Sequence, residues 1–246
     1  MVDQRTDGAV PAPLYQDEAA RMAVLRDYGV LDSLPEPQFD DIAFLASYIC
    51  GAPIALVSLV DEVRQWFKAK IGTDMEETPR DVAFCAHAIL KPDEVFVVPD
   101  AHEDPRFATN PFVRDEPHVR FYAGAPLVSP EGMPLGTLCV FDAVPGFLSP
   151  AQTRALGALA REVVVHLELR RAVAALSRPL AELSSDPMLE PGVRDELRQA
   201  SEEASSASAL VGQAMERVLE AELRMQNLVN RVRSVQGRAA EPLPGG

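Results

Sequence analysis

The chain has 246 residues, of which 47% are hydrophobic, enough for one domain of ordinary size with a packed core and an additional extended element. It carries 37 Asp and Glu against 23 Lys and Arg, which gives a formal net charge of -14. A surface of this sign repels phosphate backbones and anionic lipid head groups, so we expect neither nucleic acid nor a membrane as a partner.

Targeting signals and cysteine spacing indicate the compartment. Residues 1–20 lack the basic start and apolar stretch of a signal peptide, and no window approaches the roughly 18 apolar residues of a membrane span. Cys50, Cys85 and Cys139 lie far apart and form no C-x-x-C pair, so the spacing indicates neither a zinc ribbon nor a redox pair. We expect a cytoplasmic protein in a reducing environment.

The N-terminal part is predicted to be a disordered tail, residues 1–16, followed by two helices. Apolar residues recur at helical spacing over residues 17–31 and again over residues 38–50. Pro35 and Pro37 separate the two helices, and Gly51 is predicted to end the second.

The pattern then changes to short β-rich runs separated by turn residues. Five strands are predicted, over residues 53–60, 65–71, 95–98, 121–128 and 135–141. A short helix is predicted over residues 81–90, and the polar connection of residues 100–116 is long enough to suggest a binding loop. This order predicts an α+β domain, residues 17–148, built on an antiparallel sheet.

The remainder, residues 149–236, is predicted to be helical, and residues 237–246 to be a second disordered tail. Ser149 and Pro150 form an N-cap and first-turn pair, and the helix is interrupted at residues 184–192 by prolines and a glycine. The last helix keeps an apolar seam with alternating steps of three and four, which predicts a coiled coil. The residues that we expect to mediate dimerisation are Leu176, Leu180, Leu183, Leu197, Val211, Val218 and Met225.

Residues from about 21 to 171 resemble a GAF domain of the type found at the front of bacterial sensor kinases and diguanylate cyclases. The matching stretches are LRDYGVLDSLPEPQF from Leu25, IALVSLVDEVRQWFK from Ile54, TPRDVAFCAHAI from Thr78, VPDAHEDPRFATN from Val98, VRFYAGAPL from Val119 and LGTLCVFD from Leu135. The resemblance implies a central antiparallel sheet flanked by helices, a pocket on one face, and dimerisation through the flanking helices. It implies no particular ligand, so the cofactor stays unknown.

A second resemblance concerns residues 174–180 (AALSRPL), which look like the phospho-accepting segment His-Glu-Leu-Arg-Thr-Pro-Leu of histidine kinases. Ala174 stands at the position of the reactive histidine and Ala175 at the acidic position, whereas Pro179 is kept. The resemblance implies a degenerate kinase-like dimerisation hairpin, which forms a long helical hairpin or coiled coil after the GAF domain and has lost phosphotransfer.

Candidate site residues were chosen around the expected pocket. Cys85 and His87 invite comparison with the Cys-His pair of bilin-binding GAF domains, but Ala86 separates them, and residues two apart on a helix point in different directions. Local ion pairs and core packing are the plainer explanation for most of the set. The candidate ligand-binding residues are Trp66, Arg80, Cys85, His87, Asp100, Arg106, Asn110, Arg120 and Tyr122. No histidine pair has the spacing of metal ligands.

From these features we expect a non-catalytic, homodimeric cytoplasmic signalling protein, with a small-molecule ligand in the GAF domain. A histidine kinase or response regulator that recognises the helical bundle is the expected partner. Two alternatives remain open: a phosphotransfer protein using His166, and a scaffold whose GAF pocket is empty. Thiol-dependent enzyme chemistry through Cys85 is a further class, which needs a thiolate of low pKa and a second thiol within reach.

Overall fold

An antiparallel sheet forms the centre of the fold in this computed structural model, which describes residues 8–184 and 191–200. Its six strands lie in the order β3-β2-β1-β6-β5-β4, with every neighbouring pair antiparallel. The strands are β1 (Ile54–Val60), β2 (Arg64–Ile71), β3 (Glu77–Pro79), β4 (Phe96–Val98), β5 (Phe121–Val128) and β6 (Pro134–Asp142).

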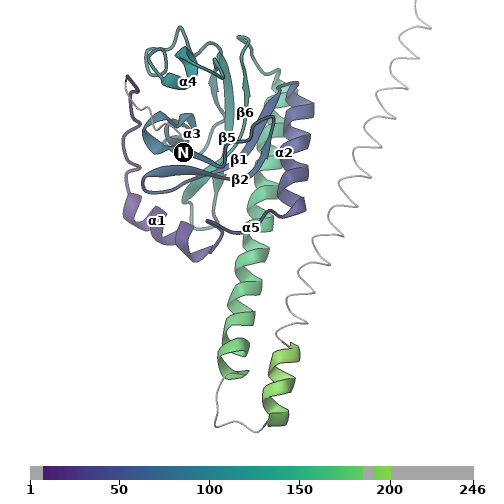
Figure 1. The fold of residues 1–246 in the computed structure, drawn as a ribbon. Coiled ribbons are helices and arrows are strands. Elements are labelled where there is room, and N and C mark those ends of the chain that lie inside the picture. Colours follow the sequence, from purple (N-terminus) through teal and green to yellow (C-terminus); the bar gives the residue numbers. More distant parts are fainter. Residues whose placement is uncertain (1–7, 185–190, 201–246) are drawn as a thin grey trace, which may run out of the picture. The chain divides into compact units, whose positions relative to one another are not determined.

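Helices cover both faces of this sheet. Figure 1 shows α2 and α5 on one side, whereas α3 and α4 lie over the other. The helices are α1 (Glu18–Asp27), α2 (Pro37–Cys50), the 3-10 helix η1 (Arg80–Val82), α3 (Phe84–Ala88), α4 (Pro111–Arg114) and α5 (Pro150–Ser184). Because both faces are covered, β1 and β6 are buried along nearly their whole length.

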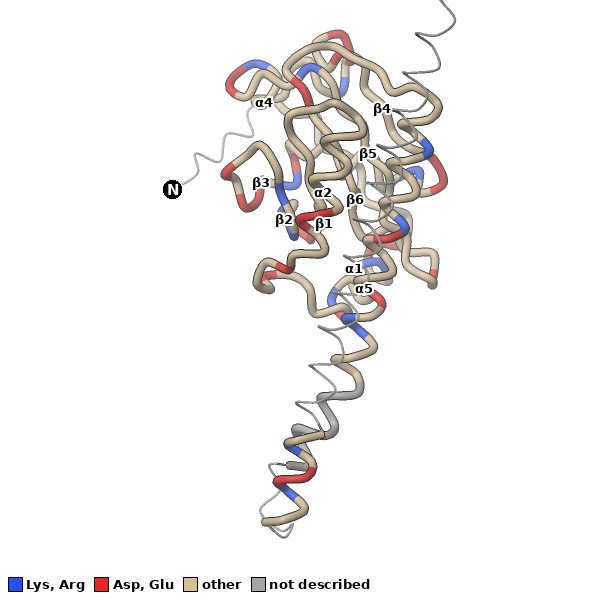
Figure 2. The backbone as a smooth tube through the Cα atoms, turned by 90° about the vertical axis from the view of Figure 1, so that its right-hand side faces the viewer, with Lys and Arg blue, Asp and Glu red and all other residues tan. Residues whose placement is uncertain are grey.

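The chain divides into two compact units, Met1–Pro179 and Leu180–Gly246. The first contains the sheet and most of α5. In the second, residues 191–200 are helical. Figure 2 shows that most Asp, Glu, Lys and Arg positions lie on loops and helices, while the strands consist mainly of uncharged residues. No helix within the described ranges is long and apolar enough to cross a membrane.

The helix boundaries follow from local sequence. Gly51 takes a left-handed conformation, with φ of 68°, and its N–H donates to Ser47 O, which ends α2 as predicted. At the start of α5, Ser149 N–H donates to Gln152 Oε1 and Gln152 N–H donates to Ser149 Oγ, a reciprocal capping box. The Gln152 side chain also donates to the last carbonyls of α2, Ile49 and Cys50, and thereby joins the two helices.

An aromatic core lies between the sheet and α3. Phe84 stacks on Phe107 with ring centroids 4.1 Å apart, and Tyr122 packs against Phe141 in a T-shaped arrangement with ring centroids 4.9 Å apart. The pairing of the strands explains this core. Leu56, Cys139 and Gly124 lie side by side on neighbouring strands, so these positions belong to the same face of the sheet.

The α+β class and the antiparallel sheet are confirmed, but some element predictions were wrong. β3 was not predicted, since three residues that include a proline give no periodic signal. The helix predicted over residues 81–90 is a 3-10 turn followed by the short α3, because Ala83 interrupts it in an extended conformation.

The dimerisation residues are only partly within the described structure. Leu176 and Leu180 belong to α5, Leu183 is 50% exposed near its end, and Leu197 is half-buried in the helix of residues 191–200. Val211, Val218 and Met225 lie outside the described residues, as does the coiled-coil seam that contains them. The helical hairpin therefore stays a prediction.

Candidate functional site

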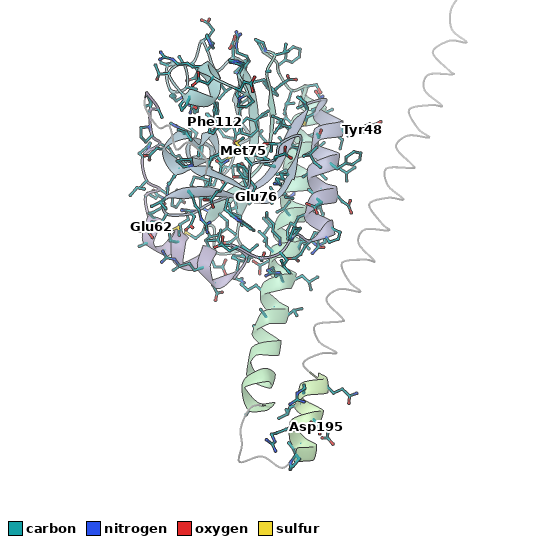
Figure 3. All side chains as sticks on the ribbon, in the orientation of Figure 1. Tyr48, Glu62, Met75, Glu76, Phe112 and Asp195 are labelled. Atoms are coloured by element: carbon teal, nitrogen blue, oxygen red, sulfur yellow. The ribbon has the colours of Figure 1, made fainter. Side chains whose placement is uncertain are left out.

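A small cavity of about 40 Å³ opens on the α3 face of the sheet. Aromatic, aliphatic and polar side chains line it; the aromatic and polar ones are Phe67, Phe84, Phe112, Phe141, Gln65, Thr73 and Thr78. Met75 also lines it, and Figure 3 labels Met75 and Phe112 on the domain. The space exceeds the ~10–15 Å³ needed for one water, so a ligand of a few heavy atoms fits without rearrangement.

Gln65 places a buried polar side chain on the wall of this cavity. The side chain lies on β2 opposite Thr78 of β3 and is 3% exposed. Its Oε1 has no hydrogen-bond partner among the described residues. An unsatisfied buried acceptor costs about 1–3 kcal/mol, so a ligand that donates a hydrogen bond to this oxygen would recover part of that free energy.

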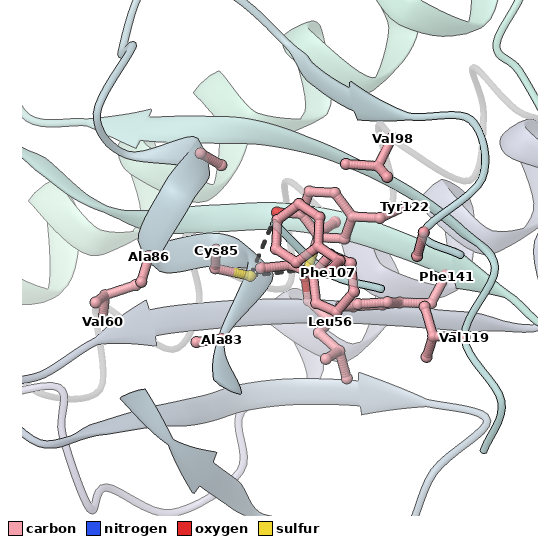
Figure 4. Close-up of a cluster of buried hydrophobic side chains, with 14 of the residues drawn as sticks. Leu56, Val60, Ala83, Cys85, Ala86, Val98, Phe107, Val119, Tyr122 and Phe141 are labelled. Carbon is pink, nitrogen blue, oxygen red and sulfur yellow. Dashed lines mark hydrogen bonds between the residues drawn. The ribbon is translucent and has the colours of Figure 1, made fainter. Parts of the chain in front are cut away.

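A cluster of buried thiol and hydroxyl groups lies beside the cavity, at the centre of the sheet. Cys85 Sγ on α3 accepts hydrogen bonds from Thr137 Oγ1 at 3.0 Å and from Tyr122 OH at 3.4 Å. Cys139 Sγ on β6 is 3.6 Å from Cys85 Sγ (Figure 4). All four side chains are completely buried. We call Cys85, Tyr122, Thr137 and Cys139 the thiol cluster.

The electrostatics of the thiol cluster distinguish its two sulfurs. Burial raises the pKa of the Cys85 thiol, but the adjacent Cys139 sulfur and the hydrogen bonds donated by Thr137 and Tyr122 outweigh it and bring that pKa to about 7. Burial and the neighbouring Cys85 raise the pKa of Cys139 well above its usual range. Cys85 is therefore the sulfur that ionises first, and Cys139 stays a thiol.

Several predicted ligand residues form ion pairs or caps away from the cavity. Arg120 donates twice to the Asp100 carboxylate, at 2.7 and 2.6 Å, which lowers the pKa of Asp100 to about 2. Arg106 pairs with Asp104 and lies over the Phe96 ring at 4.8 Å.

Asn110 accepts from Phe112 N–H at the start of α4, and its amide donates to Val82 O, so this side chain fixes a helix end to η1. Arg80 Nη1 donates to Glu18 Oε1 at 2.5 Å, although its Nη2 has no partner among the described residues.

The other predicted ligand residues are divided between two faces. Trp66 pairs with Leu59 and alternates with Gln65 and Phe67, so its side chain points to the opposite face of the sheet. His87 lies on the outer side of α3, with Nε2 3.1 Å from Val10 O, and burial lowers its pKa. Of the nine predicted residues, the structure joins Cys85 with Tyr122 and Asp100 with Arg120, and none lines the cavity. Their role in ligand binding stays a prediction.

Sequence reasoning missed Gln65 and the contact between the two cysteines. Gln65 sits in an ordinary alternating strand, and only its unpaired oxygen singles it out. Cys85 and Tyr122 were candidate ligand-binding residues, but their contacts with Cys139 and Thr137 were not predicted. A search for C-x-x-C spacing cannot find thiols that lie 54 positions apart.

His166, the residue of the phosphotransfer alternative, does not lie on the surface of its helix. The side chain is 3% exposed and packs edge-on against Phe39, with ring centroids 6.0 Å apart. Burial lowers its pKa. A phospho-accepting histidine must be reached by a partner protein, and this one is enclosed. No group of His, Cys, Asp and Glu within residues 8–184 and 191–200 is arranged to hold a metal ion.

The chain belongs to the GAF domain family, whose pattern matches residues 34–167. It is 43% identical over 168 residues to a cyclic di-GMP phosphodiesterase of Pseudomonas aeruginosa, an alignment that covers 68% of this chain and 28% of that protein. The chain thus spans less than a third of the length of this relative.

Two solved structures are similar to this chain at much lower identity. The GAF domain of an Acinetobacter phosphoenolpyruvate-protein phosphotransferase is 16% identical, with a TM-score of 0.47, covering 66% of this chain and 97% of that one. The chromophore-binding domain of a bacteriophytochrome from R. palustris is 15% identical, with a TM-score of 0.44, covering 65% of this chain and 64% of that one.

The relative overturns the expectation of a non-catalytic protein. It is named as a phosphodiesterase, which is an enzyme, at 43% identity. The expectation rested on Ala174 at the place of a phospho-accepting histidine, and that substitution concerns phosphotransfer alone. It carries no information about the hydrolysis of a cyclic dinucleotide, so the inference from a lost histidine to a protein without any catalytic function was wrong.

Proposed function

We propose that this chain is a sensory GAF module that controls the turnover of cyclic di-GMP, and that the cavity beside Gln65 receives the signal. The observation that carries the proposal is the 43% identity over 168 residues to a cyclic di-GMP phosphodiesterase. The alignment covers 28% of that relative, so phosphodiesterase activity enters here as part of the proposal.

The size of the cavity supports a division between signal and substrate. At about 40 Å³ it cannot enclose a cyclic dinucleotide, since pockets for ligands of that size occupy about 300 Å³ or more. Cyclic di-GMP is therefore the substrate whose turnover is controlled, and the signal is a smaller molecule. The aromatic wall and the Gln65 acceptor favour a compact, mostly apolar ligand that carries one hydrogen-bond donor.

A chain of contacts can carry the signal from the cavity to α5. Gln65 and Phe67 on β2 line the cavity, and the next residue, Lys68, points to the opposite face. Lys68 Nζ donates to Glu36 Oε1 at 2.6 Å, and Arg170 of α5 donates to the same oxygen at 2.5 Å. A displacement of β2 by a ligand would thus alter the position of α5 through a shared carboxylate.

The partners expected from the sequence remain proposals. A homodimer through α5 and the helical region after it is supported by the apolar seam of the sequence, and a histidine kinase or response regulator as partner by the resemblance of residues 174–180 to a kinase segment. Native mass spectrometry of the protein from its own host would report the oligomeric state and any retained ligand together.

The decisive experiment measures cyclic di-GMP hydrolysis by the protein as its host makes it, comparing the wild type with Gln65→Leu. Leucine has a similar shape and removes the unpaired oxygen, so the variant should be as stable as the wild type or more stable. The proposal expects hydrolysis in the wild type and a several-fold change of rate in the variant.

A matched control is Val63→Thr, which changes a 74% exposed side chain at the turn before β2 and should leave the rate unchanged. Absence of hydrolysis in the wild type would overturn the assignment to cyclic di-GMP turnover. Equal rates in the wild type and Gln65→Leu would overturn the role of the cavity alone.

A further inference from the structure

The two buried sulfurs of the thiol cluster are close enough to react with each other. Their separation of 3.6 Å compares with a disulfide bond length of about 2.05 Å, so closure needs an approach of about 1.5 Å. Cys139 lies on β6, which is paired on both sides by β1 and β5 and is therefore fixed. Cys85 lies on α3, a helix of five residues whose N-terminus has no side-chain cap within the described structure. The approach therefore requires movement of α3 alone.

The hydrogen bonds give the two sulfurs different chemical roles. Thr137 Oγ1 and Tyr122 OH both donate toward Cys85 Sγ, which stabilises a thiolate at that position. Cys139 Sγ instead faces an acceptor, Leu56 O, at 3.7 Å, which stabilises the protonated thiol. Cys85 is arranged as a nucleophile and Cys139 as the second thiol that resolves the product.

Neighbours of both cysteines line the cavity, but neither sulfur does, so a small oxidant that enters the cavity reaches the pair only when the wall at Phe84 or Leu56 moves. Both cysteines are fully buried, but the cavity wall contains Phe84, the residue before Cys85, and Leu56, whose carbonyl contacts Cys139. The volume of about 40 Å³ admits hydrogen peroxide or a short alkyl hydroperoxide and excludes bulky disulfides such as oxidised glutathione.

We propose that Cys85 and Cys139 form a dithiol–disulfide site that is oxidised by small hydroperoxides. This inference stands independently of the proposed control of cyclic di-GMP. It assigns a modification site to two residues whose burial alone would mark them as inert core cysteines.

The proposed reaction has two steps. The Cys85 sulfur attacks one peroxide oxygen, the O–O bond breaks, and the leaving oxygen takes the thiol proton to give water or an alcohol, which leaves Cys85 as a sulfenic acid. The Cys139 sulfur then attacks the Cys85 sulfur, the S–O bond breaks, and hydroxide leaves with the Cys139 proton as water. The two thiols lose two electrons, and the peroxide gains them.

The disulfide would change the candidate site. It joins α3 to the central strand β6, and Phe84, next to Cys85, forms part of the cavity wall. Oxidation therefore alters the shape of the cavity that receives the signal under the proposed function.

The test treats the purified full chain with hydrogen peroxide and measures its intact mass before and after, followed by mapping of crosslinked peptides. We expect the mass to fall by about 2 Da, the mass of two hydrogens, and to recover with dithiothreitol. The same loss is expected in Cys50→Ser and is absent from Cys85→Ser and Cys139→Ser. Cys50 is the matched control, because burial raises its pKa to about 11.

A fourth variant tests the mechanism. Thr137→Val removes the shortest hydrogen bond to Cys85 Sγ and should slow disulfide formation several-fold. If a serine variant fails to fold by circular dichroism, peptide mapping of the wild type and Cys50→Ser decides. Three results for the folded wild type would overturn the proposal. They are an unchanged mass, a gain of oxygen atoms at Cys85 without a crosslink, and a crosslink to Cys50.

Discussion

Arg80 Nη1 donates to Glu18 Oε1 over 2.5 Å and so joins the turn before α3 to α1 across 62 positions of sequence. Arg21, whose side chain is fully buried, donates to the other side of the same carboxylate group through Nε at 2.9 Å. One carboxylate thus neutralises two enclosed guanidinium groups. Removing it would leave both of them without a counterion in a region shielded from water.

Glu18→Gln should therefore destabilise the domain by about 3 kcal/mol, the typical cost of removing one partner of a buried charge cluster. Urea unfolding followed by circular dichroism measures the change. Asp32→Asn is a control, because its pairing with Arg64 is exposed at the Asp32 end and should contribute less than about 1 kcal/mol. Equal losses in both variants would contradict the special role of Glu18.

The same carboxylate predicts the acid stability of the fold. Burial acts to raise the pKa of Glu18, but hydrogen bonds and charges from Arg21 and Arg80 outweigh it and lower that pKa to about 2. In the unfolded chain the pKa is near 4.5, so the stabilisation is complete above that pH and is lost as the pH falls from about 4.5 toward 2. In Glu18→Gln the free energy of unfolding should depend less on pH over this range. An unchanged dependence on pH would contradict the role given to the Glu18 carboxylate.

A second buried charge, Lys68, connects the sheet to α2 and α5. Its side chain is fully buried and donates to Ser33 Oγ, Leu34 O and Glu36 Oε1. Burial lowers the pKa of Lys68, although Glu36 opposes that shift. Glu36→Ala should therefore cost about 3 kcal/mol, because the buried ammonium then keeps only neutral hydrogen-bond partners and the charge of Asp40 nearby, and Arg170 also loses its pairing with Glu36.

The double variant Glu36→Ala with Lys68→Met tests this explanation. Methionine fills the space without charge, so a large part of the stability lost in Glu36→Ala should return, as measured by urea midpoint at constant slope. If the double variant is less stable than Glu36→Ala, the loss arises from packing of the lysine stem and not from an unpaired charge.

Gly136 is required by a close approach of two central strands. A Cβ at this position would lie 1.9 Å from Ser58 O and 2.8 Å from Leu59 Cα, both of which are backbone atoms. Gly136→Ala should therefore separate β1 from β6 and cost about 3 kcal/mol or more. Gly132→Ala is the control: its φ of +82° strains alanine, but no atom lies within 4 Å, so the cost should be about 1 kcal/mol. Thermal unfolding of the two variants separates crowding from backbone strain.

The sheet and its covering helices could be predicted because each element carries its own periodic signal. The run of residues 53–60 predicts a buried strand by itself, and Ser149 with Pro150 predicts a helix start by itself. The site could not be predicted in this way. Arg80 contacts Glu18, which is 62 positions away in the sequence, and Cys85 contacts Cys139, which is 54 positions away. A single sequence does not reveal such pairs, so arginines that neutralise carboxylates were indistinguishable from arginines that bind a ligand.

His166 gives a last prediction, because it is a basic side chain that is only 3% exposed. Its Nε2 makes no hydrogen bond within the described residues, and burial lowers its pKa below the ordinary value of 6.5. In the unfolded chain this histidine binds a proton near pH 6.5, whereas in the folded chain it does so only at lower pH. The free energy of unfolding should therefore fall as the pH decreases below 6.5. His166→Leu should remove part of this slope between pH 7 and pH 5 and stabilise the domain by about 1 kcal/mol at the lower pH. Some slope should remain, since burial also lowers the pKa of His87. A slope that His166→Leu does not alter would show that this histidine is protonated inside the folded domain.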